Sequence, residues 1–166
     1  MKKIFSLAIR SLVSRFKIKQ MDISTNKRAY FDYQILETYE TGIELKGFEV
    51  KAIKTGHLNL AGSYAIIKNN QLWLLNADIP AYQPKNTPLD YDSKRTRRLL
   101  LKTSEINNLA DRVKAKGLTL TPLKVYTKNN LIKIEIGLAK SRKKYDKREF
   151  VKKREAQRQI QERLRG

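Results

Sequence analysis

The segment that most constrains the fold runs from Leu131 to Ala139, just before a strongly charged C-terminus. Apolar residues alternate there with polar or small ones: Ile132, Ile134, Ile136 and Leu138 against Lys133, Glu135, Gly137 and Ala139. Because successive side chains of a strand point to opposite faces, this pattern predicts a β-strand with one buried and one solvent-exposed face. Further short strand-like runs separated by turn signals are typical of a small barrel or sandwich.

Two β-hairpins are predicted around pairs of asparagines. The first joins Tyr64 to Lys68, the turn Asn69-Asn70 and Leu72 to Asn76, and the second joins Leu123 to Thr127, the turn 128–130 and the segment from Leu131. Asparagine tolerates the left-handed conformation that tight hairpin turns need. The expected fold is mainly β: a small antiparallel β-barrel with two or three added helices and a basic C-terminal tail.

Two short helices are expected between the strands. One covers Phe48 to Thr55, with Gly56 as its C-terminal stop. The other begins at Thr103 or Ser104, where a hydroxyl can cap a helix, and ends at Gly117. Its apolar residues Ile106, Leu109 and Val113 share one face. Helices and strands do not alternate often enough for a Rossmann-like sheet.

Positive charge is concentrated at the two ends of the chain. The formal net charge is +20; residues 140–166 hold twelve Lys or Arg against four acids, and the first twenty residues hold six and no acid. A nucleic acid backbone or a lipid headgroup could accept such a tail, but few protein surfaces could. The tail's position after a core-forming middle points to RNA. We therefore expect a barrel over residues 21–139 and a basic tail over residues 140–166.

The tail is expected to be disordered until anions neutralise it and helical once bound. Asp146 and Glu149 resemble a capping pair at a helix start. Ala156, Ile160 and Leu164 follow at four-residue spacing, which gives only a thin apolar stripe.

Residues 1–20 form a basic amphipathic segment whose Phe5, Ile9, Leu12 and Phe16 share a helical face. Four readings stay open: a start at Met21 instead, a dispensable extension, organelle targeting and membrane contact. No apolar run reaches the roughly 18 to 20 residues that span a bilayer, so a soluble protein without a stable membrane partner is expected. The chain has no cysteine, which excludes disulfides and is compatible with a reducing compartment.

No active site is expected. His57 is the only histidine, which excludes multi-histidine metal sites, and its surroundings are typical of a turn. Asp90 and Asp92 lack the further acids that a calcium loop needs. No phosphate loop, nucleophile elbow or metalloprotease motif occurs. We predict no catalytic residue, no metal and no cofactor.

A basic cluster lies in the predicted loop over Tyr82 to Arg98. Its members are Lys94, Arg95, Arg97 and Arg98. They are expected either to face solvent or to contact an RNA backbone, and the sequence does not choose between these alternatives.

Aromatic residues are a second possible RNA contact, since bases stack on aromatic rings. Tyr30, Phe31, Tyr33 and Tyr39 crowd one segment, where burial in the barrel is favoured over base stacking. Tyr145 lies outside the barrel pattern with little core to join, which leaves base stacking or simple exposure.

Five stretches carry a family resemblance: NKRAYFDY (26–33), ETYETGIELKGFEVKAIKTGHLNL (37–60), TRRLLL (96–101), KGLTLTPLKVY (116–126) and KIEIGLAKSRKKYDKRE (133–149). In this order they resemble the small protein B family, which binds tmRNA in bacterial trans-translation. The resemblance implies an OB-fold-like barrel that grips the tRNA-like domain of tmRNA. It implies a tail that enters the decoding centre and vacant mRNA channel of a stalled ribosome, permitting rescue and peptide tagging.

The same resemblance implies a cytoplasmic adaptor rather than an enzyme, with elongation factor Tu bound to charged tmRNA as a further partner. Glu40, Leu100 and Lys133 match barrel positions that support tmRNA binding. The tail residues Lys143, Lys144, Tyr145, Asp146, Lys147 and Arg148 match the motif that acts near the decoding centre.

Three features fit the family pattern less well. Tyr145 stands where the family often has His or Gln, and Glu162 to Gly166 is more polar than in many members. Phosphate repels an acid, so Glu40 would either accept hydrogen bonds from base amines or position a nearby cation. The alternative function is a general RNA chaperone or ribosome-associated protein whose charge alone drives binding. Scrambling residues 140–166 at constant composition would leave its activity unchanged.

Overall fold

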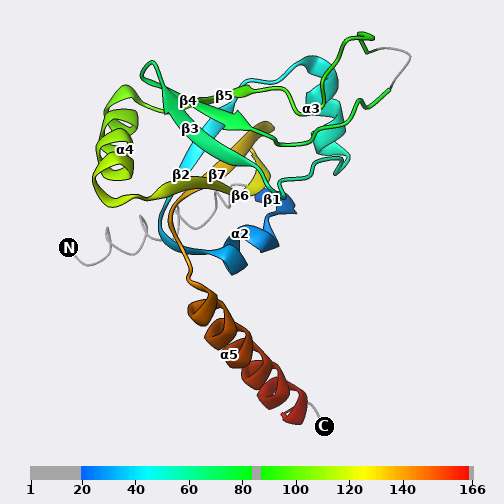
Figure 1. Cartoon of the computed structure of the whole chain (residues 1–166). Helices are drawn as coiled ribbons and strands as arrows, with labels where there is room; N and C mark the ends of the chain where they lie inside the picture. The colour runs from blue at the N-terminus through cyan, green and yellow to red at the C-terminus, as the bar shows by residue number, and fades with distance from the viewer. Residues whose placement is uncertain (1–19, 84–86, 165–166) are drawn as a thin grey trace, which may run out of the picture.

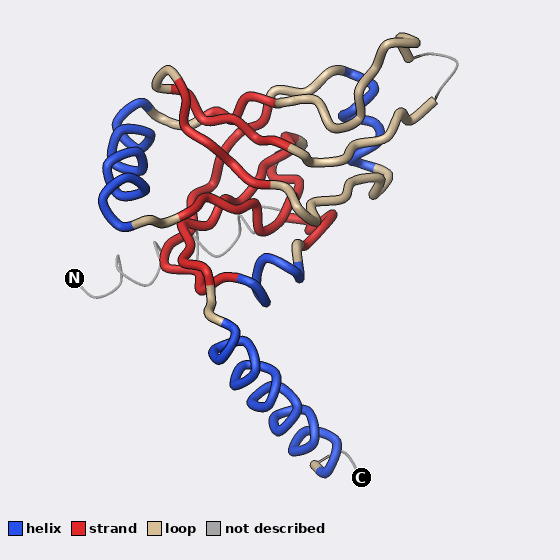
Figure 2. The backbone as a smooth tube through the Cα atoms, viewed as in Figure 1, coloured by secondary structure: helices blue, strands red, loops and turns tan. Residues whose placement is uncertain are grey.

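The computed structural model describes residues 20–83 and 87–164, so the helix predicted over residues 1–20 lies outside the described residues except for Gln20. The strands are β1 (Gln20–Thr25), β2 (Tyr33–Ile43), β3 (Tyr64–Lys68), β4 (Gln71–Leu75), β5 (Arg97–Leu100), β6 (Thr119–Lys128) and β7 (Leu131–Ser141). The helices are α2 (Lys27–Asp32), α3 (Gly47–Lys54), α4 (Thr103–Lys116) and α5 (Lys144–Arg163). Figures 1 and 2 show the strands grouped at the centre and the helices around them.

The strands close into a barrel. Their order is β1-β6-β3-β4-β5-β2-β7, and an additional pairing of β7 with β6 closes the sheet on itself. All of these pairings are antiparallel. β1 is an additional partner of β6 and pairs with the other edge of residues 124–128, a stretch that also pairs with β7. Closure leaves few unpaired strand edges. The predicted fold class, a mainly β antiparallel barrel with added helices, is confirmed.

Both predicted hairpins are present, and asparagine makes both turns. Asn69 and Asn70 have φ of 50° and 57°, and Asn129 and Asn130 have φ of 51° and 63°. Two consecutive left-handed residues are typical of the type I′ turn, whose twist matches that of the flanking strands. Lys128, which was expected in the second turn, is instead the last residue of β6.

β7 is buried on one face along its length and on both faces near its end. Ile134, Ile136 and Leu138 are fully buried, as the alternation predicts. Gly137 and Ala139 are buried as well, so the prediction of a wet opposite face is wrong there. Leu123 packs directly over Gly137; a Cβ at that glycine would lie 2.9 Å from Leu123 Cδ1.

The predicted helix after Gly47 is α3, and it begins one residue earlier than expected. The Lys46 backbone N–H donates to Glu49 Oε2 at 2.7 Å, which satisfies one of the free amides at the helix start. Ala52 and Ile53 are fully buried against the barrel. Gly56 has a φ of +87°, a conformation that glycine adopts without strain, and the helix stops just before it.

α4 confirms the second predicted helix, but its N-cap is Lys102 and not Thr103 or Ser104. The chain enters the helix one residue early because the Glu105 carboxylate accepts the Lys102 backbone N–H at 3.3 Å, so a capping hydroxyl is not needed. Gly117, with φ of 57°, ends it as predicted.

α5 projects away from the barrel, with its first turn near α2 (Figure 1). It begins at Lys144, and Asp146 is its third residue rather than its cap, since Asp146 Oδ2 accepts the Lys143 backbone N–H at 3.1 Å. The predicted disorder of the free tail in solution stays a prediction. None of the described helices is long and apolar enough to cross a membrane.

Candidate nucleic-acid interface

The strand register brings two of the predicted barrel residues together at Gly42. Gly42 on β2 pairs with Leu100 on β5 and with Lys133 on β7. Paired residues of neighbouring strands point to the same face of a sheet, so Leu100 and Lys133 flank the glycine on the outside of the barrel. A Cβ at Gly42 would lie 3.2 Å from Leu100 Cβ. The missing side chain therefore leaves room for Leu100, which is 50% exposed.

Glu40 lies two residues before Gly42 and thus faces the same side. Together with Leu100 and Lys133 it lines an open hollow of about 720 Å³, to which Arg98 and Lys102 also contribute. The three residues predicted from the resemblance are 93 positions apart at most and form a single surface here.

Glu40 is held by two neighbours on β6. Its carboxylate accepts a hydrogen bond from Tyr126 Oη at 2.6 Å and from Lys128 Nζ at 2.8 and 3.0 Å. The hydrogen bonds from Lys128 and then Tyr126 lower the pKa of Glu40, and the charge of Lys133 lowers it further. Burial and, to a smaller extent, the hydrogen bond to Glu40 raise the pKa of Tyr126. Its hydroxyl therefore keeps its proton and stays a donor. Of the two expected roles for Glu40, the contacts match the positioning of a cation.

The acids on this face have cationic partners of their own. Glu135, which pairs with Glu40 across the strands, lies 3.5 Å from Lys124 Nζ. Lys124 also lies 5.5 Å from the centre of the Tyr126 ring. In contrast, Lys133 and Arg98 form no ion pair with any described residue. Two cations on this face are thus available to phosphate.

Sequence reasoning did not find Tyr126 or Lys128. Both alternate with inward residues on the same face of β6 as Lys124, but Tyr126 is buried there while Lys128 stays half-buried. Their common partner Glu40, however, is 86 and 88 positions away in the chain.

The predicted tail residues lie around the first turn of α5, and one of them faces the barrel. Lys147 Nζ lies 2.6 Å from Asp32 Oδ1 and 5.8 Å from the centre of the Phe31 ring. The hydrogen bond from Lys147 lowers the pKa of Asp32. Arg142 Nε donates to the Tyr33 carbonyl at 3.1 Å just before the helix. The base of α5 is therefore attached to α2 and the start of β2.

The remaining tail residues point to solvent where the structure describes them. Lys143, Asp146 and Arg148 are exposed, and Tyr145 is 68% exposed. Lys144 is the first residue of the helix. Tyr145 and Arg148 flank a shallow hollow beside Phe31.

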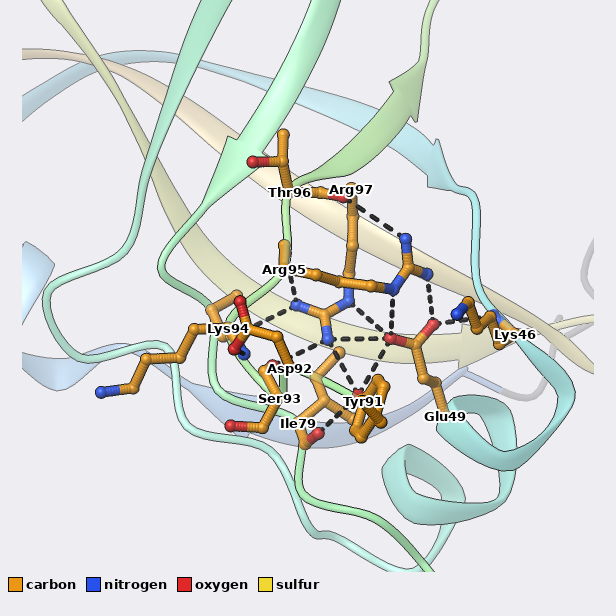
Figure 3. Close-up of polar contacts among 11 residues, drawn as sticks. Lys46, Glu49, Ile79, Tyr91, Asp92, Ser93, Lys94, Arg95, Thr96 and Arg97 are labelled. Atoms are coloured by element: carbon orange, nitrogen blue, oxygen red, sulfur yellow. Dashed lines mark hydrogen bonds and ion pairs between the residues drawn. The ribbon is translucent and has the colours of Figure 1, made fainter. Parts of the chain in front are cut away.

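The basic cluster between residues 94 and 98 is divided between the interior and the surface (Figure 3). Both readings of the sequence are wrong for Arg97, which is fully buried and lies 2.8 Å from Glu49 Oε1. Arg95 binds the other oxygen of the same carboxylate at 2.5 Å. Lys94 and Arg98 are exposed, which fits either reading.

Glu49 is the centre of this buried network. Burial by itself would raise the pKa of Glu49, but the hydrogen bonds from Arg95 and the Lys46 amide and the charge of Arg97 lower it to about 2. Tyr91 Oη lies 2.7 Å from the Ile79 carbonyl oxygen and 3.1 Å from Glu49 Oε1, so its single hydrogen can be donated to either oxygen. The network ties α3 to the loop before β5, the strand that carries Arg98 and Leu100.

The aromatic segment is less buried than predicted. Tyr39 packs against the core but is only half-buried, as are Phe31 and Tyr33. Tyr30 is exposed, so the prediction of burial is wrong there. It lies on α2, a short helix at the barrel surface that the sequence analysis did not anticipate.

The residues considered for other chemistry do not assemble into a site. His57 lies just after α3, exposed, with Nδ1 2.8 Å from Thr55 Oγ1. Asp92 accepts the Lys94 backbone N–H at 2.8 Å, an ordinary local turn contact. Within residues 20–83 and 87–164, no three His, Asp or Glu side chains cluster closely enough to hold a metal ion.

Comparison with known proteins assigns the family. The pattern of the SmpB protein family matches residues 23–166. An SsrA-binding protein of Thermosipho africanus is 52% identical over 86% of this chain and 95% of its own length. One from Gloeothece citriformis is 49% identical over 84% and 90%. A solved chain from "tmRNA-SmpB: a journey to the center of the bacterial ribosome" superposes with a TM-score of 0.61 at 43% identity, covering 73% of this chain and 85% of that one. This chain therefore belongs to the SmpB family.

Proposed function

We propose that the chain is a tmRNA-binding adaptor of trans-translation. In this proposal the barrel binds the tRNA-like domain of tmRNA, and the basic C-terminal segment acts at the ribosome that tmRNA rescues. Family membership, the relatives that are named SsrA-binding proteins and the similarity to a tmRNA-SmpB structure support it.

The observation that carries the proposal is the outer face around Gly42. Leu100 offers an exposed apolar contact, and Lys133 and Arg98 offer cations without a described acidic partner. Proteins recognise folded RNA through backbone contacts and exposed bases, which need cations and apolar surface side by side. Glu40 acts indirectly, by holding Lys128 at the rim of the same face.

For the tail we propose the division of labour that the resemblance implies. Residues 140–166 would enter the decoding centre and the vacant mRNA channel, whose walls carry phosphate. Tyr145 would stack on a base there, with Lys143, Lys144, Asp146, Lys147 and Arg148 around it. Elongation factor Tu and a cytoplasmic location stay predictions that rest on the resemblance.

The barrel part is tested by single substitutions in the full chain and a titration against labelled tRNA-like domain. Lys133→Ala and Leu100→Ala are each expected to weaken binding about 5- to 150-fold, since each removes a contact worth roughly 1–3 kcal/mol. Lys51→Ala is the matched control, because it removes one exposed lysine from α3, outside the hollow. Equal losses for Lys133→Ala and Lys51→Ala would show that charge alone drives binding.

The tail part is tested by scrambling residues 140–166 at constant composition. The proposal predicts near-normal tmRNA affinity and loss of peptide tagging on stalled ribosomes. Unchanged tagging would favour the general, charge-driven RNA binder, and a parallel loss of tmRNA affinity would contradict the separation of roles.

A further inference from the structure

We propose that the RNA interface continues past the Gly42 face, which consists of Glu40, Gly42, Leu100 and Lys133, onto β3 and β4. There Trp73 stacks on an unpaired base of the bound RNA. This inference rests on the proposed function, because it extends the same interface to residues for which no role has been given. The surface concerned, here the Trp73 face, consists of Tyr64, Ile66, Trp73, Leu75, Arg98 and Leu100.

The register places Trp73 at the middle of this face. It pairs with Ile66 on one side and with Arg98 on the other, so these three side chains form a row across three strands. Tyr64 pairs with Leu75 in the next row. The alternate residues Leu72, Leu74 and Leu99 are buried inside the barrel, so the row points outward.

The Trp73 face is apolar and partly exposed, since Trp73 and Leu75 are half-buried beside exposed Tyr64 and Ile66. Tyr64 is 40% exposed and Ile66 37% exposed. In Figure 1, α4 stands to one side of β3 and β4, and no helix of the described chain crosses in front of them. A contiguous, partly exposed apolar surface on a protein that carries so much charge marks an interaction site.

The charges around the Trp73 face favour a polyanion. Its other outward residues on these strands are Lys68 and Gln71, so β3, β4 and β5 contribute two cations and no acid to the face. Glu44, just after β2, has a backbone N–H that donates to the Arg98 carbonyl at 2.9 Å, which places one exposed acid at the margin beside Arg98. Arg98 forms no ion pair with any described residue. A base stacked on the Trp73 ring would place its phosphate within the field of Arg98, the arrangement that single-stranded nucleic acid sites use.

The Trp73 face adjoins the proposed tmRNA site, so the same RNA is its expected ligand. Arg98 and Leu100 belong to the Trp73 face and also line the hollow with Glu40 and Lys133. An RNA held at the Gly42 face therefore has this surface as its immediate neighbour across β5. The aromatic ring then supplies affinity without base specificity, because every base has a π-face.

The chain contains a single tryptophan, so its emission reports on this face alone. The full chain is titrated with the tRNA-like domain of tmRNA while indole emission and the anisotropy of labelled RNA are recorded together. We expect the emission to fall with the same midpoint as the anisotropy rises. Unchanged emission at RNA saturation would overturn the inference and leave the face to a protein partner or a second copy. Absence of saturable anisotropy would instead refute the proposed function.

Substitution gives the second test. Trp73→Ala in the full chain should weaken RNA binding between about 5-fold and 150-fold, the usual range for loss of one base stack. Trp73→Phe keeps a stacking ring and should lose much less. Thermal melting of both variants checks the fold. A folded Trp73→Ala variant that binds RNA with wild-type affinity would overturn the inference, even if RNA changes the tryptophan emission of the wild-type protein.

Discussion

Replacing Glu49 by Gln tests the role of the buried network most severely. Glu49 is fully buried and receives hydrogen bonds from both Arg95 and Arg97. Gln keeps the shape of the side chain but removes its charge and turns one oxygen into a donor that faces guanidinium donors. Arg97, itself fully buried, would lose its anionic partner.

The expected cost follows from this geometry. Removing one member of a buried ion pair leaves an uncompensated charge and costs about 3–5 kcal/mol. The pKa gives a similar figure, because a change from 4.5 in the unfolded chain to about 2 in the folded one corresponds to about 3 kcal/mol. Both values predict a fall in melting temperature of roughly 6–20 °C.

The assay is urea unfolding of the full chain at pH 6 and pH 3. Because the folded pKa of Glu49 lies below the unfolded one, its contribution is present above pH 4.5 and is lost as the pH falls toward 2. The wild type should lose about 2 kcal/mol of this contribution between pH 6 and pH 3. Glu49→Gln lacks this carboxylate and cannot lose its contribution. The difference in free energy of unfolding between the two proteins should therefore be about 2 kcal/mol smaller at pH 3 than at pH 6.

Glu44→Gln is the control, since Glu44 is an exposed glutamate of the same segment without a described ion pair. It should change stability by less than about 0.5 kcal/mol. A loss below about 1 kcal/mol for Glu49→Gln at pH 6, or a gap that is the same at pH 3, would contradict the reasoning.

Three further outcomes are expected. Gly137→Ala should lower the free energy of unfolding by about 1–3 kcal/mol, because its Cβ would lie 2.9 Å from Leu123 Cδ1; an unchanged melting curve would show that Leu123 moves freely. Asp32→Asn removes the partner of Lys147 and should speed hydrogen exchange in the first turn of α5 while costing less than about 1 kcal/mol of global stability; unchanged exchange would mean that the pair does not hold the helix. Tyr145→Ala should leave stability and tmRNA affinity nearly unchanged, since the ring is 68% exposed, and should reduce peptide tagging; equal tagging would exclude a stacking role.

Local features of the fold could be predicted from the sequence because they depend on neighbouring residues. Asn69-Asn70 and Asn129-Asn130 specify their turns by tolerating positive φ, and the alternation in β7 identifies its inward side chains. Gly117 similarly ends α4 by adopting φ of 57°.

Features that depend on distant partners could not be predicted in this way. Arg97 looks like a solvent-facing cation until Glu49, 48 positions earlier, is brought beside it. The burial of Gly137 on its second face requires Leu123 from β6. Sequence patterns report the period of a strand but not which strand will cover it.

The candidate site was found through the family resemblance rather than through its residues. Nothing local to Glu40 predicts that it holds Lys128 and Tyr126, and nothing local to Trp73 predicts that it lies between Ile66 and Arg98. Each arrangement follows from strand register across the closed barrel.

The central claim, recognition of tmRNA, is tested most directly by competition. The full chain is bound to labelled tRNA-like domain of tmRNA at about 150 mM salt, where nonspecific phosphate contacts are weakened, and unlabelled tRNA or unlabelled tRNA-like domain is added. The account predicts that the tRNA-like domain displaces the label at equimolar levels, whereas tRNA displaces it only at large excess. Equal displacement by both would contradict specific recognition and leave a protein that binds RNA through its charge.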